Sequence, residues 1–294
     1  MASLKEIRTR ITSVNSTKQI TSAMKMVSAA KLKRAQDRIV QMRPFAVKLS
    51  EVLQNLSGTM AEMENKFVEA RPVNRVLIVP IASNRGLCGG FNANVIKATT
   101  KLVNDKYKGA EVTLLPIGKK TYEWFKKSDN LYKGDKLTDP SKTAEVYDDL
   151  SFEKSSEICE PIMNAFWDGD YDLVIMVYNQ FKNAATQLVQ TEQLLPVVAP
   201  ESDASSPEAD FIFQPGKFEL LETLIPSALK TQFYKGLLDS NASEHGARMT
   251  AMHKATDNAE DLLGNLKLTY NKARQAAITT EILEIVGGAE ALEG

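Results

Sequence analysis

The sequence predicts an α/β protein in which the two ends of the chain form a long antiparallel coiled coil beside a central α/β domain. Two observations predict this fold. Both ends carry long helical patterns, over about residues 3–55 and 217–286, and the residues between them alternate short apolar runs with amphipathic segments. A terminal pattern of this length indicates a rod, whose apolar side must be buried against a partner helix or another protein.

The first helix has an apolar face that is interrupted. Apolar residues recur from Leu4 to Val14 at three- and four-residue steps, which is typical of one helix face. Residues 15–19 are all polar, and the pattern predicts that the same face resumes at Ile20, Met24 and Val27. We therefore expect one stripe, with a gap, that packs on the C-terminal helix.

The middle of the chain reads as a Rossmann-like domain. We expect strands at 75–82, 111–117 and 172–178, more exposed strands at 187–195 and 210–214, and helices at 91–107, 119–127 and 152–167. Strands that alternate with helices favour a partly parallel, doubly wound sheet. Residues 201–210 are polar and predict a loop or linker. The predicted domains are 1–58 for the first coiled-coil helix, 73–214 for the α/β domain, and 217–288 for the last helix with its tip.

The last helix carries an unbroken heptad pattern. Steps of four and three residues connect Leu238, Ala242, His245, Met249, Met252, Thr256, Ala259, Leu263, Leu266, Tyr270 and Ala273. Most of these residues are apolar and many are small, as in a coiled-coil seam, and the strict repeat predicts left-handed supercoiling. The obvious partner is the first helix, which must then run antiparallel.

The end of the last helix is apolar in a different way. Its large apolar residues are Ile278, Ile282, Leu283, Ile285 and Val286. With the alanines beside them they predict a helix that is apolar around most of its circumference, which is not stable in water unless something encloses it. Gly287 and Gly288 predict the end of the helix. We interpret 276–286 as a plug inside a partner.

Composition excludes several classes of protein. The hydrophobic fraction of 43% and charged fraction of 25% are ordinary for a soluble protein. No run of 18 apolar residues predicts a membrane span, and the first residues lack the apolar region of a secretory signal. The first 43 residues carry ten basic and two acidic side chains, which favours nucleic acid, an anionic membrane or an acidic protein as partner.

Few residues are candidates for catalysis, metal binding or nucleotide binding. Cys88 and Cys159 have no CxxC context and are expected to be free thiols, and two histidines on one helix predict neither a zinc site nor acid–base catalysis. The segment SNRGLCGGFN follows a strand and precedes a helix, but its glycine spacing fits neither a dinucleotide fingerprint nor a P-loop. It favours a tight strand-to-helix connection over a phosphate site. We therefore expect no catalytic residues, no metal, no cofactor and no direct nucleotide binding.

Two other classes stay open from these patterns. A stand-alone α/β enzyme with helical arms would turn over a nucleotide or other substrate by itself, and the broken glycine motif argues against it. A nucleic-acid-binding coiled coil would use the basic first helix, and its binding would weaken steeply with salt. No aromatic residues interleave with the basic ones to stack on bases, so nucleic acid is not an expected partner.

Four long segments carry a specific resemblance. They are TSAMKMVSAAKLKRA at 21–35, SNRGLCGGFN at 83–92, SEHGARMTAMHKATDNAEDLL at 243–263 and LTYNKARQAAITTEILEIVGGAEAL at 268–292. Together they resemble the gamma subunit of rotary F-type ATP synthases over the full length of the chain. The middle, from about 120 to 215, is the weakest match. The sequence shows neither a transit peptide nor a regulatory cysteine insert, and in both respects it resembles the bacterial type of this subunit.

The resemblance implies a central rotor shaft with no catalytic site of its own. In that family the coiled coil enters a ring of three alpha and three beta subunits, and the α/β domain lies beside the epsilon subunit and the membrane c-ring. Rotation driven by proton or sodium flow changes the conformation of each catalytic beta subunit in turn, for ATP synthesis or hydrolysis. The complex would lie on the cytoplasmic face of the bacterial inner membrane, with this chain as a peripheral subunit.

The resemblance also implies which residues take part in coupling. Those that match the family's contacts with the beta subunits are Met24, Lys25, Arg248, Arg274, Gln275 and Thr279. We expect Lys25, Arg248 and Arg274 to form charge-assisted hydrogen bonds with the ring. We expect the apolar tip (Ile278, Ile282, Leu283, Ile285 and Val286) to make sliding contact in a sleeve at the far end of the ring.

Overall fold

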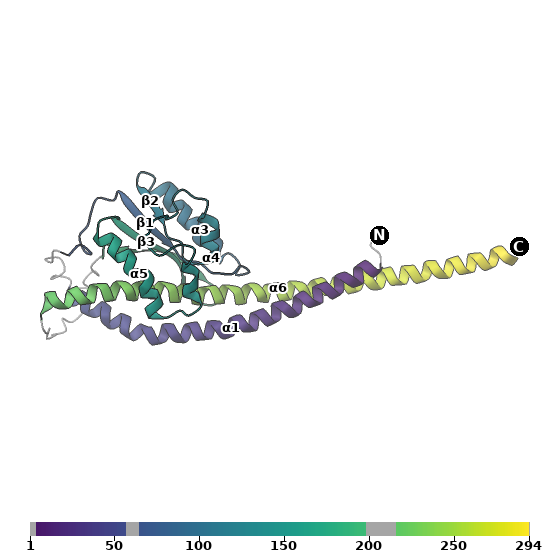
Figure 1. The fold of residues 1–294 in the computed structure, drawn as a ribbon. Helices are drawn as coiled ribbons and strands as arrows, with labels where there is room; N and C mark the ends of the chain where they lie inside the picture. Colours follow the sequence, from purple (N-terminus) through teal and green to yellow (C-terminus); the bar gives the residue numbers. More distant parts are fainter. Residues whose placement is uncertain (1–3, 57–64, 198–215, 294) are drawn as a thin grey trace. The chain divides into compact units, whose positions relative to one another are not determined.

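The computed structural model describes residues 4–56, 65–197 and 216–293. The chain divides into two compact units, one made of residues 29–248 and the other of residues 1–28 together with 249–294. Helix α1 (Leu4–Asn55) and helix α6 (Lys217–Glu293) each belong to both units (Figure 1).

The unit of residues 29–248 contains a four-stranded sheet in the order β2-β1-β3-β4. Its elements are β1 (Arg75–Pro80), α3 (Phe91–Lys101), β2 (Glu111–Leu114), α4 (Lys119–Phe125), α5 (Phe152–Trp167), β3 (Leu173–Phe181) and β4 (Gln187–Leu195). Strand β1 pairs in parallel with both β2 and β3, whereas β4 pairs antiparallel with β3. This is the partly parallel sheet that the alternating pattern predicts.

Helices cover both faces of this sheet (Figure 1). On one face, Val76, Ile78 and Ile175 pack with Val95 of α3 and Phe125 of α4. On the other face, a larger core joins the sheet to α5 and to parts of both long helices. That core includes Leu77, Val79, Met176, Ile162, Phe166, Leu53, Leu56, Ile225, Leu229 and Phe233. Strands covered on both faces are buried almost continuously, which explains why they read as apolar runs and not as alternating patterns.

Some predicted boundaries differ from the structure. The helix expected over 91–107 is α-helical only to Lys101, and Leu102–Lys106 forms a π-helical turn. Strands β1 and β2 are shorter than predicted, although Ile81 and Ile117 still form an isolated bridge beyond their ends. The predicted linker at 201–210 and strand at 210–214 lie outside the described residues.

The second unit is an antiparallel pair of helix segments. Lys18 Nζ lies 2.8 Å from Glu260 Oε1, and Thr256 Oγ1 donates a hydrogen bond of 2.8 Å to Thr21 Oγ1. As the residue number rises along α1 it falls along α6, which shows the antiparallel direction. On α6 the heptad positions from Met252 to Ala273 are buried or half-buried, while most residues between them are exposed. The predicted seam of α6 is confirmed in this unit.

The predicted seam of α1 is wrong at Ile20 and Val27, whose side chains are 59% and 56% exposed. Met24 of the same predicted stripe is half-buried, and the buried positions beside it are Thr21 and Ser28. Polar residues hold the seam because a hydroxyl pair can be satisfied across it, as Thr21 and Thr256 show. Ile20, Met26 and Val27 therefore face outward on this part of α1.

The predicted end of the last helix is also wrong. Helix α6 continues through Gly287 and Gly288 to Glu293, beyond the expected boundary at 288. Neither glycine has a positive φ, so neither adopts the left-handed conformation that ends a helix. A glycine costs a helix only about 1 kcal/mol relative to alanine, and alanine, glutamate and leucine follow here.

One buried carboxylate makes the stability of the first unit dependent on pH. Asp239 of α6 is 8% exposed and interacts with Lys235 on its own helix, Glu192 on β4 and Arg43 on α1. Burial raises the pKa of Asp239 from 3.8 to about 6. Since the folded pKa is the higher one, the folded state favours the protonated carboxyl. This stabilising contribution is complete below about pH 4 and is lost as the pH rises through 6.

We predict that Asp239→Asn stabilises the chain at about pH 7.5 by about 1–3 kcal/mol, because each pKa unit corresponds to about 1.4 kcal/mol. At about pH 3.5 the gain should vanish. Urea unfolding at both pH values measures it, and Asp105→Asn, an exposed aspartate, is the control. Equal stability of the Asp239 variant and the parent at pH 7.5 would contradict the prediction.

Candidate functional site

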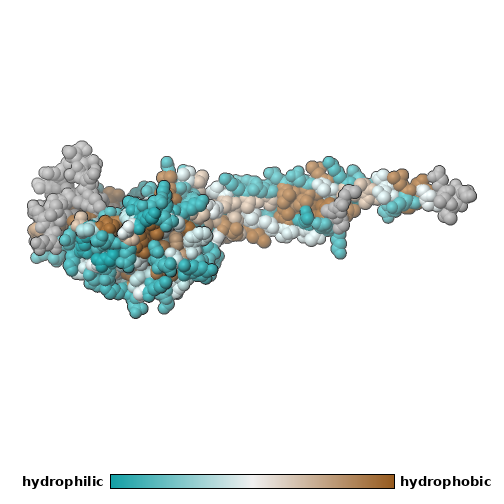
Figure 2. All heavy atoms as spheres, turned by 90° about the horizontal axis from the view of Figure 1, so that it is seen from above, coloured by the Kyte–Doolittle hydropathy of each residue, from teal (hydrophilic) through white to brown (hydrophobic). Residues whose placement is uncertain are grey.

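The last part of α6 extends past the seam. Ala273, the last residue of the heptad pattern, is half-buried. The described side chains from Arg274 to Ala289 are all exposed. The tip residues are among them: Ile278 is 47% exposed, Ile282 54%, Leu283 65%, Ile285 67% and Val286 56%. Figure 2 shows hydrophobic side chains at the surface along this end of α6. Within the described residues nothing covers this apolar segment.

The tip is apolar on one side and not all round. At about 100° per residue, the five large apolar side chains occupy roughly half of the circumference. Glu281 and Glu284 lie on the opposite side. The expected apolar character around most of the circumference therefore depends on the small side chains of Ala276 and Ala277, since the large apolar side chains occupy one side.

The other predicted contact residues of this unit are accessible to different degrees. Arg274, Gln275 and Thr279 are all exposed, and the Thr279 hydroxyl donates a hydrogen bond of 2.9 Å to the carbonyl oxygen of Gln275. Met24 and Lys25 are half-buried. The described residues provide no ion pair for Lys25 or Arg274.

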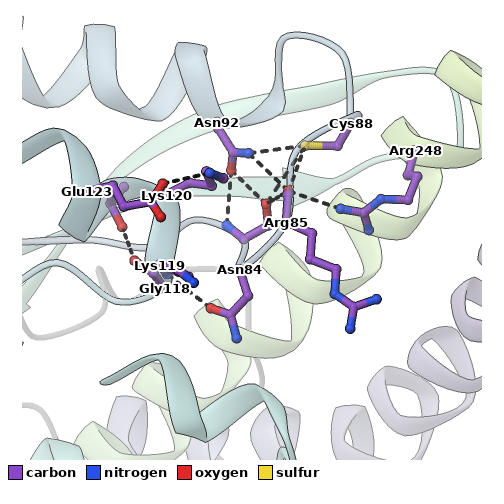
Figure 3. Close-up of polar contacts among 11 residues, drawn as sticks. Asn84, Arg85, Cys88, Asn92, Gly118, Lys119, Lys120, Glu123 and Arg248 are labelled. Atoms are coloured by element: carbon purple, nitrogen blue, oxygen red, sulfur yellow. Dashed lines mark hydrogen bonds and ion pairs between the residues drawn. The ribbon is translucent and has the colours of Figure 1, made fainter. Parts of the chain in front are cut away.

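The glycine-rich segment forms the connection between β1 and α3. Ser83 Oγ lies 2.7 Å from the carbonyl oxygen of Arg85, and the Ser83 N–H donates to Asn92 Oδ1 at 3.0 Å. Asn84 Oδ1 accepts from the Lys119 N–H at 3.0 Å, and Asn84 Nδ2 donates to the carbonyl oxygen of Ala144. Asn84 thus holds the loop to the start of α4, as Figure 3 shows, and to Ala144 in the segment before α5. The structure confirms the tight strand-to-helix connection.

Arg248 is placed differently from the expectation. It is 8% exposed and lies within the unit of residues 29–248, where its guanidinium pairs with Glu244. Its Nη2 donates to the carbonyl oxygens of Arg85 at 3.1 Å and Gly86 at 3.2 Å (Figure 3). Burial raises the pKa of Glu244, and the positive charge of Arg248 opposes this shift. In this chain Arg248 therefore binds the loop that precedes α3.

Burial shifts the pKa of both cysteines and of one histidine. Cys88 and Cys159 are both free and buried, as predicted, and burial raises the pKa of each thiol, to about 12 for Cys159. Burial lowers the pKa of His245 to about 4, so this side chain is neutral at pH 7. Among the residues that the structure describes, no group of three or more histidine, cysteine or carboxylate side chains could hold a metal ion. No helix in the same residues has the length and hydrophobicity needed to cross a membrane.

Comparison with known proteins decides the family. The model of a family described as ATP synthase matches residues 3–292. A curated protein of Flavobacterium johnsoniae named ATP synthase gamma chain is 57% identical over 100% of both chains. One of Christiangramia forsetii with the same name is 55% identical, again over the full length of both. The chain belongs to the ATP synthase gamma chain family.

Solved structures of ATP synthases have the same fold. A chain of the Tetrahymena thermophila mitochondrial ATP synthase, in a structure of the central stalk and c-ring, is 25% identical, with a TM-score of 0.57 over 80% of this chain and 99% of that one. A chain of the Euglena gracilis mitochondrial ATP synthase rotor is 22% identical, with a TM-score of 0.66 over 94% and 98%. The resemblance found in the sequence is confirmed. As a gamma chain, this protein is a non-catalytic shaft subunit of an ATP synthase complex.

Several residues that build the site were not predicted. Glu244 holds Arg248, while Asn84 and Asn92 shape the loop. The i,i+4 spacing of Glu244 and Arg248 is a signal for an ion pair on one helix, and it could have indicated that Arg248 has a partner within the chain. The two asparagines bind backbone groups of the loop, and the sequence alone does not show which backbone groups lie near them.

Proposed function

We propose that this gamma chain couples rotation of a membrane c-ring to conformational cycling of the catalytic beta subunits. It would turn inside a ring of three alpha and three beta subunits and carry the epsilon subunit on its α/β unit. The complex would lie on the cytoplasmic face of the bacterial inner membrane and move protons. Nucleotide binding and hydrolysis would belong to the ring and not to this chain.

The observation that carries the proposal is the uncovered end of α6. This helix has 77 residues, which at about 1.5 Å per residue span about 115 Å. Its end exposes five large apolar side chains on one side and two carboxylates on the other. A sleeve that encloses this end removes the apolar side chains from water, which favours binding by about 25 cal/mol for each Å² buried.

Coupling then follows from differential binding. A shaft orientation can change the conformation of a beta subunit only if it contacts the alternative conformations unequally. The exposed cation Arg274 and the half-buried cation Lys25 supply such contacts through charge-assisted hydrogen bonds to carboxylates. The apolar tip supplies contact that does not fix one position, because apolar contacts lack a preferred direction.

Co-expression with the cognate alpha and beta subunits tests this function. The chain should enter a complex with three alpha and three beta subunits, be inactive by itself, and support sustained ATP turnover in the complex. A chain that stays free in solution, or that hydrolyses ATP alone, would overturn the proposal. The second outcome would favour a stand-alone enzyme.

The half-buried position of Met24 gives a further prediction. Met24→Lys places a second ammonium group beside Lys25 and should bind carboxylates of the beta subunit too strongly, so that rotation is impeded. Proton pumping per ATP hydrolysed in membrane vesicles should fall several-fold, whereas Met24→Leu, of similar volume, should retain it. An unchanged ratio of pumping to hydrolysis in Met24→Lys would refute this role.

A further inference from the structure

A small cavity lies at the edge of the sheet where the parallel strands begin. Its volume is about 150 Å³, and all of its lining residues belong to the unit of residues 29–248. Buried side chains of Leu137, Ala165 and Tyr171 form part of its wall. The other lining residues are polar or charged: Arg75 of β1, Glu111 and Thr113 of β2, Tyr132 and Lys136 from the segment after α4, and Asp170 before β3. None of the residues discussed for coupling lines this cavity.

The register of the sheet brings a cation and a carboxylate together at the open side of the cavity. Arg75 and Glu111 are directly paired across the parallel strands β1 and β2, so their side chains leave the same face of the sheet. Asp172 accepts the Arg75 N–H at 2.8 Å, and its other carboxylate oxygen lies 3.2 Å from Arg75 Nη2. This contact fixes the guanidinium but engages only one of its terminal nitrogens. Among the residues that the structure describes, neither the remaining guanidinium N–H groups nor the Glu111 carboxylate has a hydrogen-bond or ion-pair partner.

The facing wall is closed by contacts within the chain. Lys136 Nζ lies 2.5 Å from Asp170 Oδ2, which ties the turn of residues 133–137 to the connection between α5 and β3. The Leu137 N–H donates to Tyr132 Oη at 2.8 Å, so the hydroxyl hydrogen of Tyr132 remains free to donate to a ligand. A Cβ added to Gly134 would lie 2.7 Å from the same oxygen, which shows how closely the turn packs on it. The cavity is therefore largely pre-formed, as ligand sites usually are.

We infer that the cavity binds a small zwitterion of the amino-acid class, with its carboxylate on Arg75 and its ammonium group on Glu111. The charged lining residues carry two charges of each sign: Arg75 and Lys136 are cations, Glu111 and Asp170 are anions. A simple anion or cation would meet a like charge there, whereas a zwitterion pairs with both signs through charge-assisted hydrogen bonds. A cavity of about 150 Å³ accommodates benzene, so a ligand of roughly six non-hydrogen atoms, such as alanine, fits. The inference does not depend on the proposed function.

Isothermal titration calorimetry of the full chain tests the ligand class. L-Alanine is the probe, and propionate and ethylammonium are the same molecule without the ammonium group or without the carboxylate. We expect L-alanine to bind with a dissociation constant of about 1 mM or lower, within the usual limit per non-hydrogen atom. Propionate, ethylammonium and the larger L-phenylalanine should each bind about tenfold more weakly, since each loses one charge contact or exceeds the cavity.

Two variants locate the site by opposite effects. Glu111→Gln keeps the volume but removes the charge, so it should weaken the binding of L-alanine and ethylammonium about tenfold and leave that of propionate unchanged. Arg75→Lys keeps a cation for Asp172 but cannot hold Asp172 and a ligand carboxylate at once, so it should weaken the binding of L-alanine and propionate. Glu157→Gln, which removes an exposed carboxylate of α5 outside the cavity, is the matched control and should bind L-alanine like the parent.

Three outcomes would overturn the inference. The first is that L-alanine gives no heat of binding up to about 50 mM. The second is that propionate or inorganic phosphate binds as tightly as L-alanine, which would show a simple anion site. The third is that Glu111→Gln and Glu157→Gln weaken the binding of L-alanine equally. Urea unfolding of Glu111→Gln should match that of the parent because the side chain is exposed, so lost binding would not reflect lost folding.

Discussion

Replacing Arg274 and Gln275 together with alanine is expected to lower ATP turnover of the assembled complex about tenfold or more, with no change in the stability of the free chain. A hydrogen bond to a charged group contributes about 1.5–3 kcal/mol, and about 1.4 kcal/mol corresponds to a factor of ten. Both side chains are exposed on a segment where α6 has no partner in the described chain. We therefore expect their contribution in assembly and coupling and not in folding.

The measurement compares two properties of the same variant. ATP hydrolysis is assayed in the complex with alpha and beta subunits, and thermal unfolding is followed in the free chain, where the midpoint should shift by less than about 2 °C, as for most surface substitutions. Asn271→Ala with Lys272→Ala removes an exposed amide and an exposed cation one turn earlier and serves as the matched control. Equal loss of stability and of turnover in the Arg274 variant would contradict the assignment.

Gly118→Ala is expected to destabilise the unit of residues 29–248 by about 3 kcal/mol or more. Gly118 has a φ of 95°, and a Cβ added there would lie 2.1 Å from the carbonyl oxygen of Ala82. Both the strained dihedral and the clash with backbone must be relieved by moving the chain, and each effect costs about 1–3 kcal/mol. The residue that follows, Lys119, donates its N–H to Asn84, so the shift should also loosen the loop of residues 83–90.

Urea unfolding of the full chain measures this effect. Gly109→Ala is the matched control, because nothing lies within 4 Å of the added Cβ and its φ is not positive. It should change the free energy of unfolding by less than about 0.5 kcal/mol, as is usual for surface positions. A Gly118 variant as stable as the Gly109 variant would show that the close approach to Ala82 can relax without cost.

The sheet could be predicted because its strands are buried on both faces. The first seven residues of β3 are all buried, and such a strand reads as a continuous apolar run in any register. The bounds of α5 match the prediction because Ser151 caps its start, and β4 ends as predicted just before Pro196. The helix end predicted at Gly287 and Gly288 was wrong. A glycine ends a helix in this way only if its φ is positive, and the sequence does not determine that angle.

The seam of α1 could not be predicted from hydrophobicity alone. Periodicity assigns Ile20 and Val27 to the buried face, but the structure buries Thr21 and Ser28 there, and their hydroxyls are satisfied by hydrogen bonds. A polar seam needs its partner helix to be known before it can be recognised. The outward apolar residues are then free for another surface, which agrees with a helix that works inside a larger assembly.

The candidate site was predicted in part. Sequence resemblance indicated Arg248 as important, but only the structure shows the carbonyl oxygens of Arg85 and Gly86 as its partners. Those contacts join residues more than 160 positions apart in the chain, and no periodic pattern encodes them. The large apolar side chains at the end of α6 are exposed in the described chain, and their role as a plug inside a partner stays a prediction.

Direct observation of rotation tests the central claim. The complex with alpha and beta subunits is immobilised by the ring, and a bead is attached through Lys108→Cys, an exposed position of the α/β unit. We predict stepwise rotation in one direction that requires ATP and stops when ATP is removed. ATP hydrolysis by the same immobilised complex, while the bead stays fixed or moves without direction, would contradict the account of this chain as a rotating shaft.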